Sequence, residues 1–248
     1  MPDHIRSFAL PYAVEPIWFF ESDAEIKGHK AYKKAKAGDS DAALELVMDL
    51  ALPRIMAYRD HFDSECIFVA PFAREVAGDN AIPLVLAVLC SVIFNAESDN
   101  DIVQSTKVYH TGADPMERLV MRPEFEGNVQ TGRRYILVDD VVSLGGTLAE
   151  LSNYIQLGGG VVGGIMVLVN AGRSKTFHPT KAQLKILRER YPHDIKDIFG
   201  IEVDALTANE AGYLVGFSST EQIRNRVIKA KKEIDLRLRS KGIDVLLS

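Results

Sequence analysis

Two adjacent carboxylates, Asp139 and Asp140, follow the apolar stretch Tyr135–Val138, which is typical of a buried strand. In a parallel sheet the side chains at the carboxyl end of a strand line the ligand crevice, so these acids are placed to meet a ligand. A carboxylate pair can accept hydrogen bonds from neighbouring hydroxyl groups, as on a ribose, or help to hold a hydrated cation. Since successive strand residues point to opposite faces, we expect the two side chains not to point into the core together.

The turn that follows, Ser143–Thr147, has the composition of a phosphate-binding loop. It leads into a helix expected at 147–157, and the start of a helix offers unpaired N–H groups and partial positive charge. Two glycines let the backbone approach a ligand closely and adopt positive φ, and two hydroxyl groups add donors. In the alternative interpretation Thr147 only caps this helix, because Thr147-Leu-Ala-Glu150 fits a capping box.

A strand–helix–strand unit would position the acids and the turn. Gly158–Gly160 ends the predicted helix, and Val161–Asn170 is a second apolar stretch that predicts a strand. Two strands joined by one helix within about 35 residues run parallel, with a right-handed crossover. Residues 66–71, CIFVAP, predict another buried parallel strand. The predicted fold is therefore α/β, with a twisted parallel sheet flanked by helices.

The rest of the chain predicts further elements on both sides of this unit. We expect strands or extended segments at 7–14, 17–20 and 101–109, and helices at 25–37, 41–58, 84–94, 181–190, 208–215 and 220–239. The helix at 208–215 opens with the capping-box pattern Thr207-Ala-Asn-Glu210. We expect a single domain, 1–248, with a core at 62–175 and extensions at 1–61 and 176–248 that form a hood, an oligomer interface or a partner surface.

The composition limits the classes of function. In 248 residues, 47% apolar and 25% charged side chains are typical of a soluble globular protein. A net charge of -5 gives no general attraction for nucleic acid, so nucleic acid is not an expected partner and a bound anion must be held locally. Cys66 and Cys90 stand apart among aliphatic residues, which favours a reducing compartment. Neither a signal peptide nor an apolar run of membrane length is evident, so we expect a cytoplasmic protein with no membrane contact.

The stretch Ile136–Thr147 resembles the phosphoribosyl pyrophosphate (PRPP) signature of the type I phosphoribosyltransferases. In that family a hydrophobic strand, two acids, a short spacer and a turn of threonine and glycine follow one another. The resemblance departs at Ser143 and Leu144, where the family prefers small hydroxyl residues, but Leu144 keeps its backbone N–H. It covers residues 64–173 and implies a type I phosphoribosyltransferase-like fold.

The resemblance also implies roles for individual residues. Asp139 and Asp140 would hold the ribose 2′- and 3′-hydroxyls. The 5′-phosphate would be wrapped by the turn residues Ser143, Leu144, Gly145, Gly146 and Thr147. The pyrophosphate loop would occupy 72–80, where Arg74, Gly78 and Asn80 loosely resemble the competence-associated and amidophosphoribosyltransferase-like branches.

Other polar residues are candidates for contacts with the leaving group and the acceptor. The polar segment 110–131 would form a mobile lid, and four cations could neutralise pyrophosphate or be solvated loop charges: Lys107, His110, Arg118 and Arg122. Asn170 and Arg173 could recognise the acceptor, although Asn170-Ala-Gly also fits a strand-ending turn. Mg²⁺ would bind together with PRPP, and no direct metal ligands are expected because metal-binding Cys and His spacing is absent.

The resemblance therefore predicts a Mg²⁺-dependent phosphoribosyltransferase that transfers the phosphoribosyl group of PRPP to a small nitrogenous acceptor and releases pyrophosphate. Such a reaction needs positioning and electrostatics from the protein more than covalent chemistry. The alternative is a non-catalytic protein of the same fold that senses PRPP or a nucleotide. A third reading is an α/β phosphate-binding protein of unrelated chemistry. Apolar segments in the two extensions would allow a homodimer.

Two further patterns are interpreted as structural. Gly158–Gly163 satisfies G-x-G-x-x-G, but it closes a helix and opens a strand, whereas a dinucleotide fingerprint follows a strand and opens a helix. The basic stretch 224–241 could touch nucleic acid, but we interpret it as the solvated face of a helix with a buried stripe.

Overall fold

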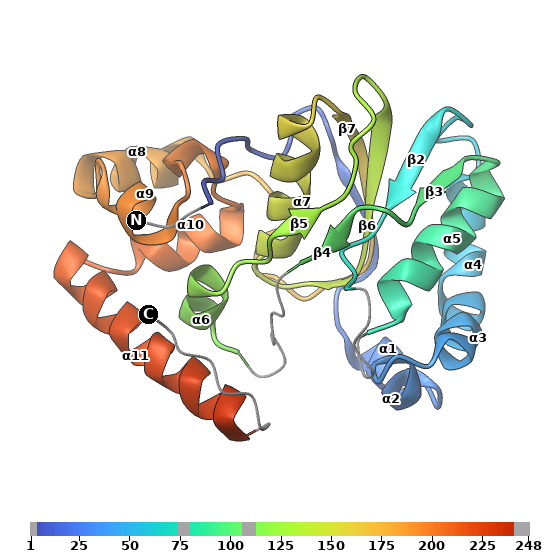
Figure 1. Ribbon diagram of the computed structural model, residues 1–248, viewed down its shortest axis with the longest axis horizontal. Coiled ribbons are helices and arrows are strands. Elements are labelled where there is room, and N and C mark those ends of the chain that lie inside the picture. The colour runs from blue at the N-terminus through green and yellow to red at the C-terminus, as the bar shows by residue number, and fades with distance from the viewer. Residues whose placement is uncertain (1–3, 74–79, 106–112, 241–248) are drawn as a thin grey trace.

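The computed structural model describes residues 4–73, 80–105 and 113–240. Its centre is a five-stranded parallel sheet in the order β1-β7-β6-β2-β3 (Figure 1). The strands are β1 (Pro16–Phe20), β2 (Cys66–Val69), β3 (Glu97–Asp99), β6 (Arg134–Val142) and β7 (Val161–Asn170). A second, antiparallel sheet consists of β4 (Val103–Gln104) and β5 (Phe125–Glu126). This architecture confirms the predicted α/β fold, a parallel sheet flanked by helices.

Helices cover both faces of the main sheet because its strands are apolar on both faces. Alternate side chains of β6 enter two different cores: Ile136 and Val138 pack on one side, Tyr135 and Leu137 on the other. Three helices close these cores: α3 (Ser40–Leu50) and α5 (Ile82–Phe94) cover the first, and α7 (Gly146–Leu157) covers the second. The helix α7 joins β6 to β7, so the predicted strand–helix–strand unit is confirmed.

The C-terminal helices form a third core beside the sheet, on the left of Figure 1. They are α8 (Lys181–Arg190), α9 (Asp194–Phe199), η2 (Val203–Ala205), α10 (Ala208–Val215) and α11 (Thr220–Ser240), and α6 (Pro115–Val120) packs among them. Met116 and Leu119 of α6 are buried in this core. Arg237 Nη2 donates to both carboxylate oxygens of Glu117, at 2.7 and 2.8 Å. The basic helix α11 therefore pairs part of its charge with α6, in addition to its solvated face.

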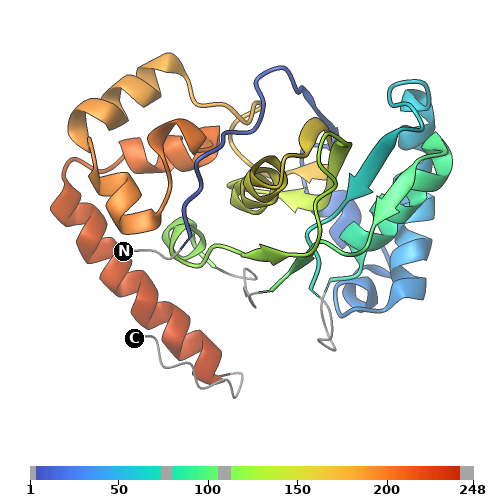
Figure 2. The ribbon, with the colours of Figure 1, turned by 45° about the horizontal axis from the view of Figure 1, so that its top comes forward.

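The N-terminal strap, residues 4–14, crosses α7 and reaches the C-terminal helices (Figure 2). The backbone N–H groups of Ser7 and Phe8 donate to Asn153 Oδ1 at 2.9 and 3.0 Å. Arg6 forms a parallel bridge with Ile201. After the strap and β1 come the short helices α1 (Ala24–Lys27), α2 (Tyr32–Ala35), α4 (Leu52–Ile55) and η1 (Met56–Tyr58). The first 61 residues thus supply an edge strand of the sheet as well as helices.

The helices predicted at 25–37 and 41–58 are each interrupted, so these two predictions are wrong in length. The first is divided into α1 and α2, and the second into α3, α4 and η1. Pro53, near the start of α4, lacks the N–H that a continuous helix would use at that position. Asp39 begins α3 by accepting a hydrogen bond from the N–H of Ala42 at 2.9 Å. The predicted helices at 181–190 and 208–215 and the strand at 161–170 are confirmed at their bounds.

Three predicted segments are organised differently in the described residues. Residues 7–14 belong to the strap and form no strand. Within 101–105, the described part of the strand expected at 101–109, only Val103–Gln104 is a strand. The described part of the lid expected at 110–131 contains α6 and β5. Asp114 and Glu117 form a capping box with Pro115 in the first turn, which is a helix start that the prediction overlooked. It also overlooked β3 and α9.

Cys66 and Cys90 are buried and unbonded to each other, as expected. Within the described ranges, every helix is too short or too polar to cross a membrane.

Candidate functional site

Asp139 and Asp140 lie near the carboxyl end of β6, between β2 and β7, with only 9% and 3% of their surfaces exposed. Asp139 lines a cavity together with the turn after β6, and Asp140 contacts Lys36 and Asn80. The two carboxylates therefore serve different surroundings, as the alternation of side chains along a strand requires. The N–H of Asp140 donates to Asp139 Oδ1 at 2.8 Å and holds the first carboxylate in place.

The two acids differ in their polar partners. Asp140 Oδ2 accepts from Lys36 Nζ at 2.7 Å and from Asn80 Nδ2 at 3.0 Å. For Asp139, burial first and the adjacent Asp140 carboxylate second raise the pKa well above its usual range. Asp140 is therefore paired with a lysine and an amide, whereas the Asp139 carboxylate lines the cavity.

The turn between β6 and α7 requires glycine at its centre. Gly145 is the residue before the helix and has φ 82°, a left-handed conformation that glycine adopts without steric cost. A Cβ on Gly145 would also stand 2.9 Å from the ring of Phe177. A Cβ on Gly146, the first residue of α7, would stand 2.8 Å from Glu210 Oε1. Both glycines thus allow other parts of the chain to approach the turn closely.

The alternative interpretation of Thr147 as a helix cap is wrong. The residue at the N-cap of α7 is Gly145, and no side chain caps this helix. Thr147 lines the cavity, and the Glu150 carboxylate is bound to Arg6, Arg122 and His4. The first N–H groups of α7 are therefore not covered by a threonine hydroxyl, which suits an anion site.

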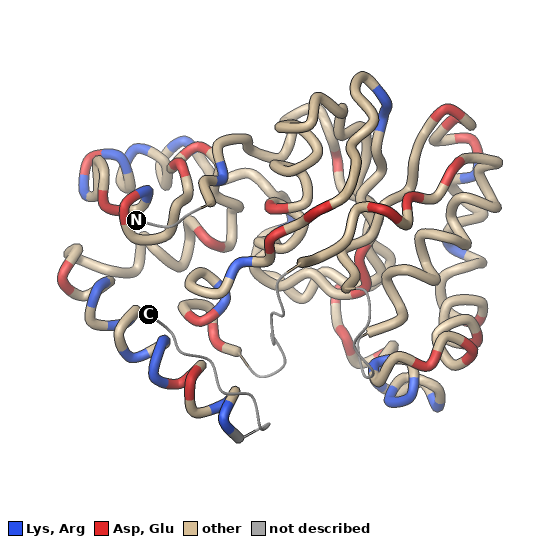
Figure 3. Tube along the Cα trace, viewed as in Figure 1, with Lys and Arg blue, Asp and Glu red and all other residues tan. Residues whose placement is uncertain are grey.

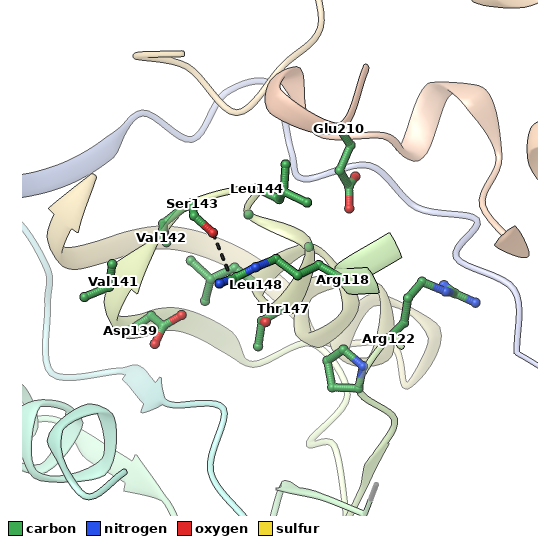
Figure 4. A pocket seen from close by; sticks show the side chains of 13 residues that line it. Arg118, Arg122, Asp139, Val141, Val142, Ser143, Leu144, Thr147, Leu148 and Glu210 are labelled. Carbon is green, nitrogen blue, oxygen red and sulfur yellow. Dashed lines mark hydrogen bonds between the residues drawn. The ribbon is translucent and has the colours of Figure 1, made fainter. Parts of the chain in front are cut away.

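The cavity at the turn brings the start of α7 together with a carboxylate (Figure 4). Its empty volume is about 440 Å³. The lining residues are Arg118, Arg122, Pro123, Asp139, Val141, Val142, Ser143, Leu144, Gly145, Gly146, Thr147, Leu148 and Glu210. All five residues of the predicted phosphate turn therefore meet Asp139 around one space. Such a space can hold a phosphate at the turn and a hydroxyl group at the acid.

Residues at the start of α10 hydrogen-bond to the backbone of the turn. Thr207 Oγ1 donates to the carbonyl of Leu144 at 2.5 Å, and Asn209 Nδ2 donates to the carbonyl of Ser143 at 2.9 Å. Asn209 Oδ1 in turn accepts from the N–H groups of Arg173 and Ser174, at 3.1 and 2.9 Å. Sequence reasoning recognised Thr207 as a helix cap, which is confirmed, but it missed the second role of Thr207 and the whole role of Asn209.

A buried charge network lies behind the turn and ties it to the N-terminal strap. Arg6 Nη2 is 2.6 Å from Glu210 Oε2, and its Nη1 is 3.4 Å from Glu150 Oε1. Burial would lower the pKa of Arg6, but the two glutamates outweigh burial and raise it. Burial would raise the pKa of Glu150, but Arg6, His4 and Arg122 together lower it. Arg6 and Glu150 are therefore held in their charged forms by this network, which was not foreseen from the sequence.

The predicted lid cations have different places. Arg118 projects into the cavity, with Nη1 donating to Ser143 Oγ at 3.1 Å, so it accompanies the turn (Figure 4). Arg122 lines the cavity wall but donates to Glu150 Oε1 and to the carbonyl of His4, both at 2.6 Å. Lys107 and His110 lie outside the described residues. The same holds for Arg74 and Gly78 of the predicted pyrophosphate loop, whereas Asn80 reaches Asp140.

The two predicted acceptor residues also differ. Asn170 Oδ1 accepts from the N–H of Gly172, and its Nδ2 donates to the carbonyl of Ser174, both at 3.0 Å. Its amide thus forms the strand-ending turn that was the alternative interpretation. Arg173 lines a second cavity, of about 1260 Å³, that shares Arg118, Ser143 and Leu144 with the first.

Comparison with known proteins gives relatives without a stated activity. No protein-family model matches the chain. It is 36% identical over 240 residues to protein TraN of Escherichia coli, an alignment that covers 94% of this chain and 54% of TraN. It is also 36% identical over 133 residues to an uncharacterized protein of Haemophilus influenzae, covering 53% of this chain and 30% of that protein. The chain thus spans about half of TraN and less than a third of the second relative.

Among solved structures, similarity is found at low identity to phosphoribosyltransferases and to a protein whose name states no activity. Adenine phosphoribosyltransferase from Thermoanaerobacter pseudethanolicus is 19% identical, with 54% of this chain and 71% of that chain aligned and a TM-score of 0.30. Hypoxanthine-guanine phosphoribosyltransferase from Bacillus anthracis is also 19% identical, with 55% of this chain and 72% of that chain aligned and a TM-score of 0.31. The AQ2163 protein from Aquifex aeolicus is 14% identical, with 63% of this chain and 88% of that chain aligned and a TM-score of 0.37.

Proposed function

We propose that the protein binds PRPP with Mg²⁺ and transfers the phosphoribosyl group to a small nitrogenous acceptor, releasing pyrophosphate. The observation that carries this proposal is the cavity in which Asp139 and the whole turn Ser143–Thr147 meet at the carboxyl end of β6. A phosphate site next to a carboxylate that can accept hydrogen bonds from hydroxyl groups matches the two ends of ribose 5-phosphate. A site for phosphate alone would not need the buried acids.

Each group of the site has a task in this reaction. The turn and Arg118 bind the 5′-phosphate, and the aspartates accept hydrogen bonds from the ribose hydroxyls. Once the ribose is fixed in this way, its anomeric carbon is held for attack by the acceptor nitrogen. The C–O bond to pyrophosphate breaks, its electron pair leaves with pyrophosphate, and the nitrogen lone pair forms the new C–N bond. Fixed charges stabilise the cationic sugar of the transition state better than water would.

Magnesium belongs to the donor in this proposal. Carboxylate oxygens are the ligands that Mg²⁺ prefers in proteins, and the Asp139 carboxylate lines the proposed donor cavity. Among residues 4–73, 80–105 and 113–240, no cluster of three His, Cys, Asp or Glu side chains could hold a metal alone. The ion would therefore be shared with the phosphates, where it neutralises charge on the leaving group.

The proposal is tested by binding and turnover. Calorimetric titration with PRPP and with ribose 5-phosphate, each with Mg²⁺, should show binding of both. Pyrophosphate release is then followed with nucleobases, a nicotinate-like acid and ammonia as acceptors. Release with one acceptor supports the transferase, and a protein that binds neither sugar phosphate is instead an α/β phosphate-binding protein of other chemistry.

One observation favours the alternative of a non-catalytic PRPP or nucleotide sensor. The turn is bound directly to α10 by Thr207 and Asn209, and through Glu210 and Arg6 to the N-terminal strap. A phosphate in the turn would therefore stabilise the contact between the sheet and both extensions. Binding of PRPP with no pyrophosphate release from any acceptor would establish this alternative.

A further inference from the structure

Lys36 stands apart from the other lysines of its segment. It follows α2 directly, and its ammonium lies 2.7 Å from Asp140 Oδ2. Lys33 and Lys34 of α2 are exposed, whereas two thirds of the Lys36 side chain is covered. Figure 3 shows the basic segment at α2 on the same lower side of the sheet as the acidic end of β6. A lysine of the N-terminal extension is thus part of the candidate site.

The position of Lys36 is fixed by the backbone as well as by charge. The N–H of Ala81 donates to the carbonyl of Ala35 at 3.1 Å, so the segment after β2 is joined to the end of α2. This bond places Asn80 and Lys36 side by side, and both donate to the same oxygen of Asp140. Burial would lower the pKa of Lys36, but the Asp140 charge and hydrogen bond outweigh it and raise that pKa, so the ammonium is charged.

The charged groups of the site follow one another through contacts. Arg118 and the helix start lie at the turn, Asp139 lines the same cavity, and Lys36 contacts the adjacent Asp140. PRPP has the same order of groups: a phosphate on carbon 5, hydroxyls on carbons 2 and 3, and pyrophosphate on carbon 1, next to carbon 2. With the 5′-phosphate in the turn and the hydroxyls at the acids, the pyrophosphate emerges on the Lys36 side.

We infer that Lys36, supplied by the N-terminal extension, binds the pyrophosphate group of the donor, and that Asp140 holds the ammonium ready until the donor arrives. This inference rests on the proposed function. An ammonium has three donors, so Lys36 can keep one hydrogen bond to Asp140 and give the others to phosphate oxygens. Negative charge grows on pyrophosphate as its bond to carbon 1 breaks, and Lys36 stabilises that charge without transferring a proton.

The test compares two ligands that differ by the pyrophosphate group. Lys36→Met should weaken binding of PRPP with Mg²⁺ by about tenfold or more, since hydrogen bonds between an ammonium and phosphate oxygens are among the stronger ones. Its affinity for ribose 5-phosphate should stay within about twofold of wild type. Lys36→Arg should retain most of the PRPP affinity, and Lys34→Met, at an exposed lysine of the adjoining helix α2, should change neither affinity.

Three results would overturn the inference. Equal losses for PRPP and ribose 5-phosphate would mean that Lys36 only seats Asp140. Unchanged affinities for both would mean that it takes no part, and a wild type that binds neither ligand would end the proposed function with it. If Lys36→Met does not fold, Lys36→Gln is measured in its place, because an amide keeps a hydrogen bond to Asp140 without the charge. Where pyrophosphate release is found, Lys36→Gln should also lower kcat more than it raises KM for the acceptor.

Discussion

The two sides of the candidate site are built in different ways. On the side of the turn, five consecutive residues, Ser143–Thr147, supply the backbone proposed to bind phosphate, and α10 and the N-terminal strap contact it from the other side. On the side of Asp140, single residues from three distant segments meet: Lys36, Asn80 and Asp140 itself. The turn side is therefore a preformed local motif, and the Asp140 side is an assembly that depends on how the chain packs. Substitutions on the turn side and on the Asp140 side should differ in their effects on stability and on ligand affinity.

Gly145→Ala should have the largest effect, because it combines a strained backbone with a collision against Phe177. We expect a loss of about 3 kcal/mol in the free energy of unfolding and of most affinity for ribose 5-phosphate. Gly132→Ala is the matched control: Gly132 also has positive φ, at 76°, but a Cβ there meets nothing within 4 Å. It should cost only about 1 kcal/mol. Equal costs in urea unfolding would show that the turn is not closely packed.

Substituting the two acids singly should distinguish the two sides. Asp140→Asn leaves the Lys36 ammonium against a neutral amide, and we expect about 1–2 kcal/mol lower stability because Lys36 is partly exposed. Asp139→Asn should not lower stability and should raise it at neutral pH, because burial and the Asp140 carboxylate disfavour the charged form of this acid in the folded state. Thermal and urea unfolding measure both. A larger cost for Asp139→Asn would reverse the assignment of the charged partner.

Thr207→Val should weaken the turn from a distance. It removes the hydroxyl that caps α10 and donates to the Leu144 carbonyl, so we expect about 1 kcal/mol lower stability and several-fold weaker binding of ribose 5-phosphate. Thr180→Val removes an equivalent cap from α8, where no contact with the turn exists among the described residues. The control should lose similar stability and no affinity, and weaker binding by the control would contradict the role of Thr207.

The smallest expected effect is on pH dependence. Since folding raises the pKa of Asp139, protonation stabilises the folded state. Relative to Asp139→Asn, wild-type stability should therefore fall as the pH rises through that raised pKa. Affinity for ribose 5-phosphate should change in the opposite direction, because the charged carboxylate is the better acceptor. Parallel profiles of the two proteins between about pH 4 and 8 would show that Asp139 titrates normally.

Much of the fold could be predicted because periodicity and turn residues act locally. The alternation of β6, the glycines that end α7 and the capping box at Thr207 each specify an element within a few residues. Errors arose where a local stop was overlooked, as at Pro53, or where a helix start was hidden in a polar segment, as at Asp114. The short strands β3 and β4 carry too few residues to show a pattern and exist because neighbouring strands pair with them.

The sequence by itself determined the local half of the site: two acids at a strand end and a glycine turn before a helix, because hydrogen bonding and φ preferences act over neighbouring residues. Only the tertiary structure decided which groups face them. Lys36 and Asn80 reach Asp140, Thr207 and Asn209 bind the turn, and Arg6 lies buried between Glu150 and Glu210. Contacts between distant segments depend on the order of the strands and on which faces must be buried, and spacing along the chain does not encode either.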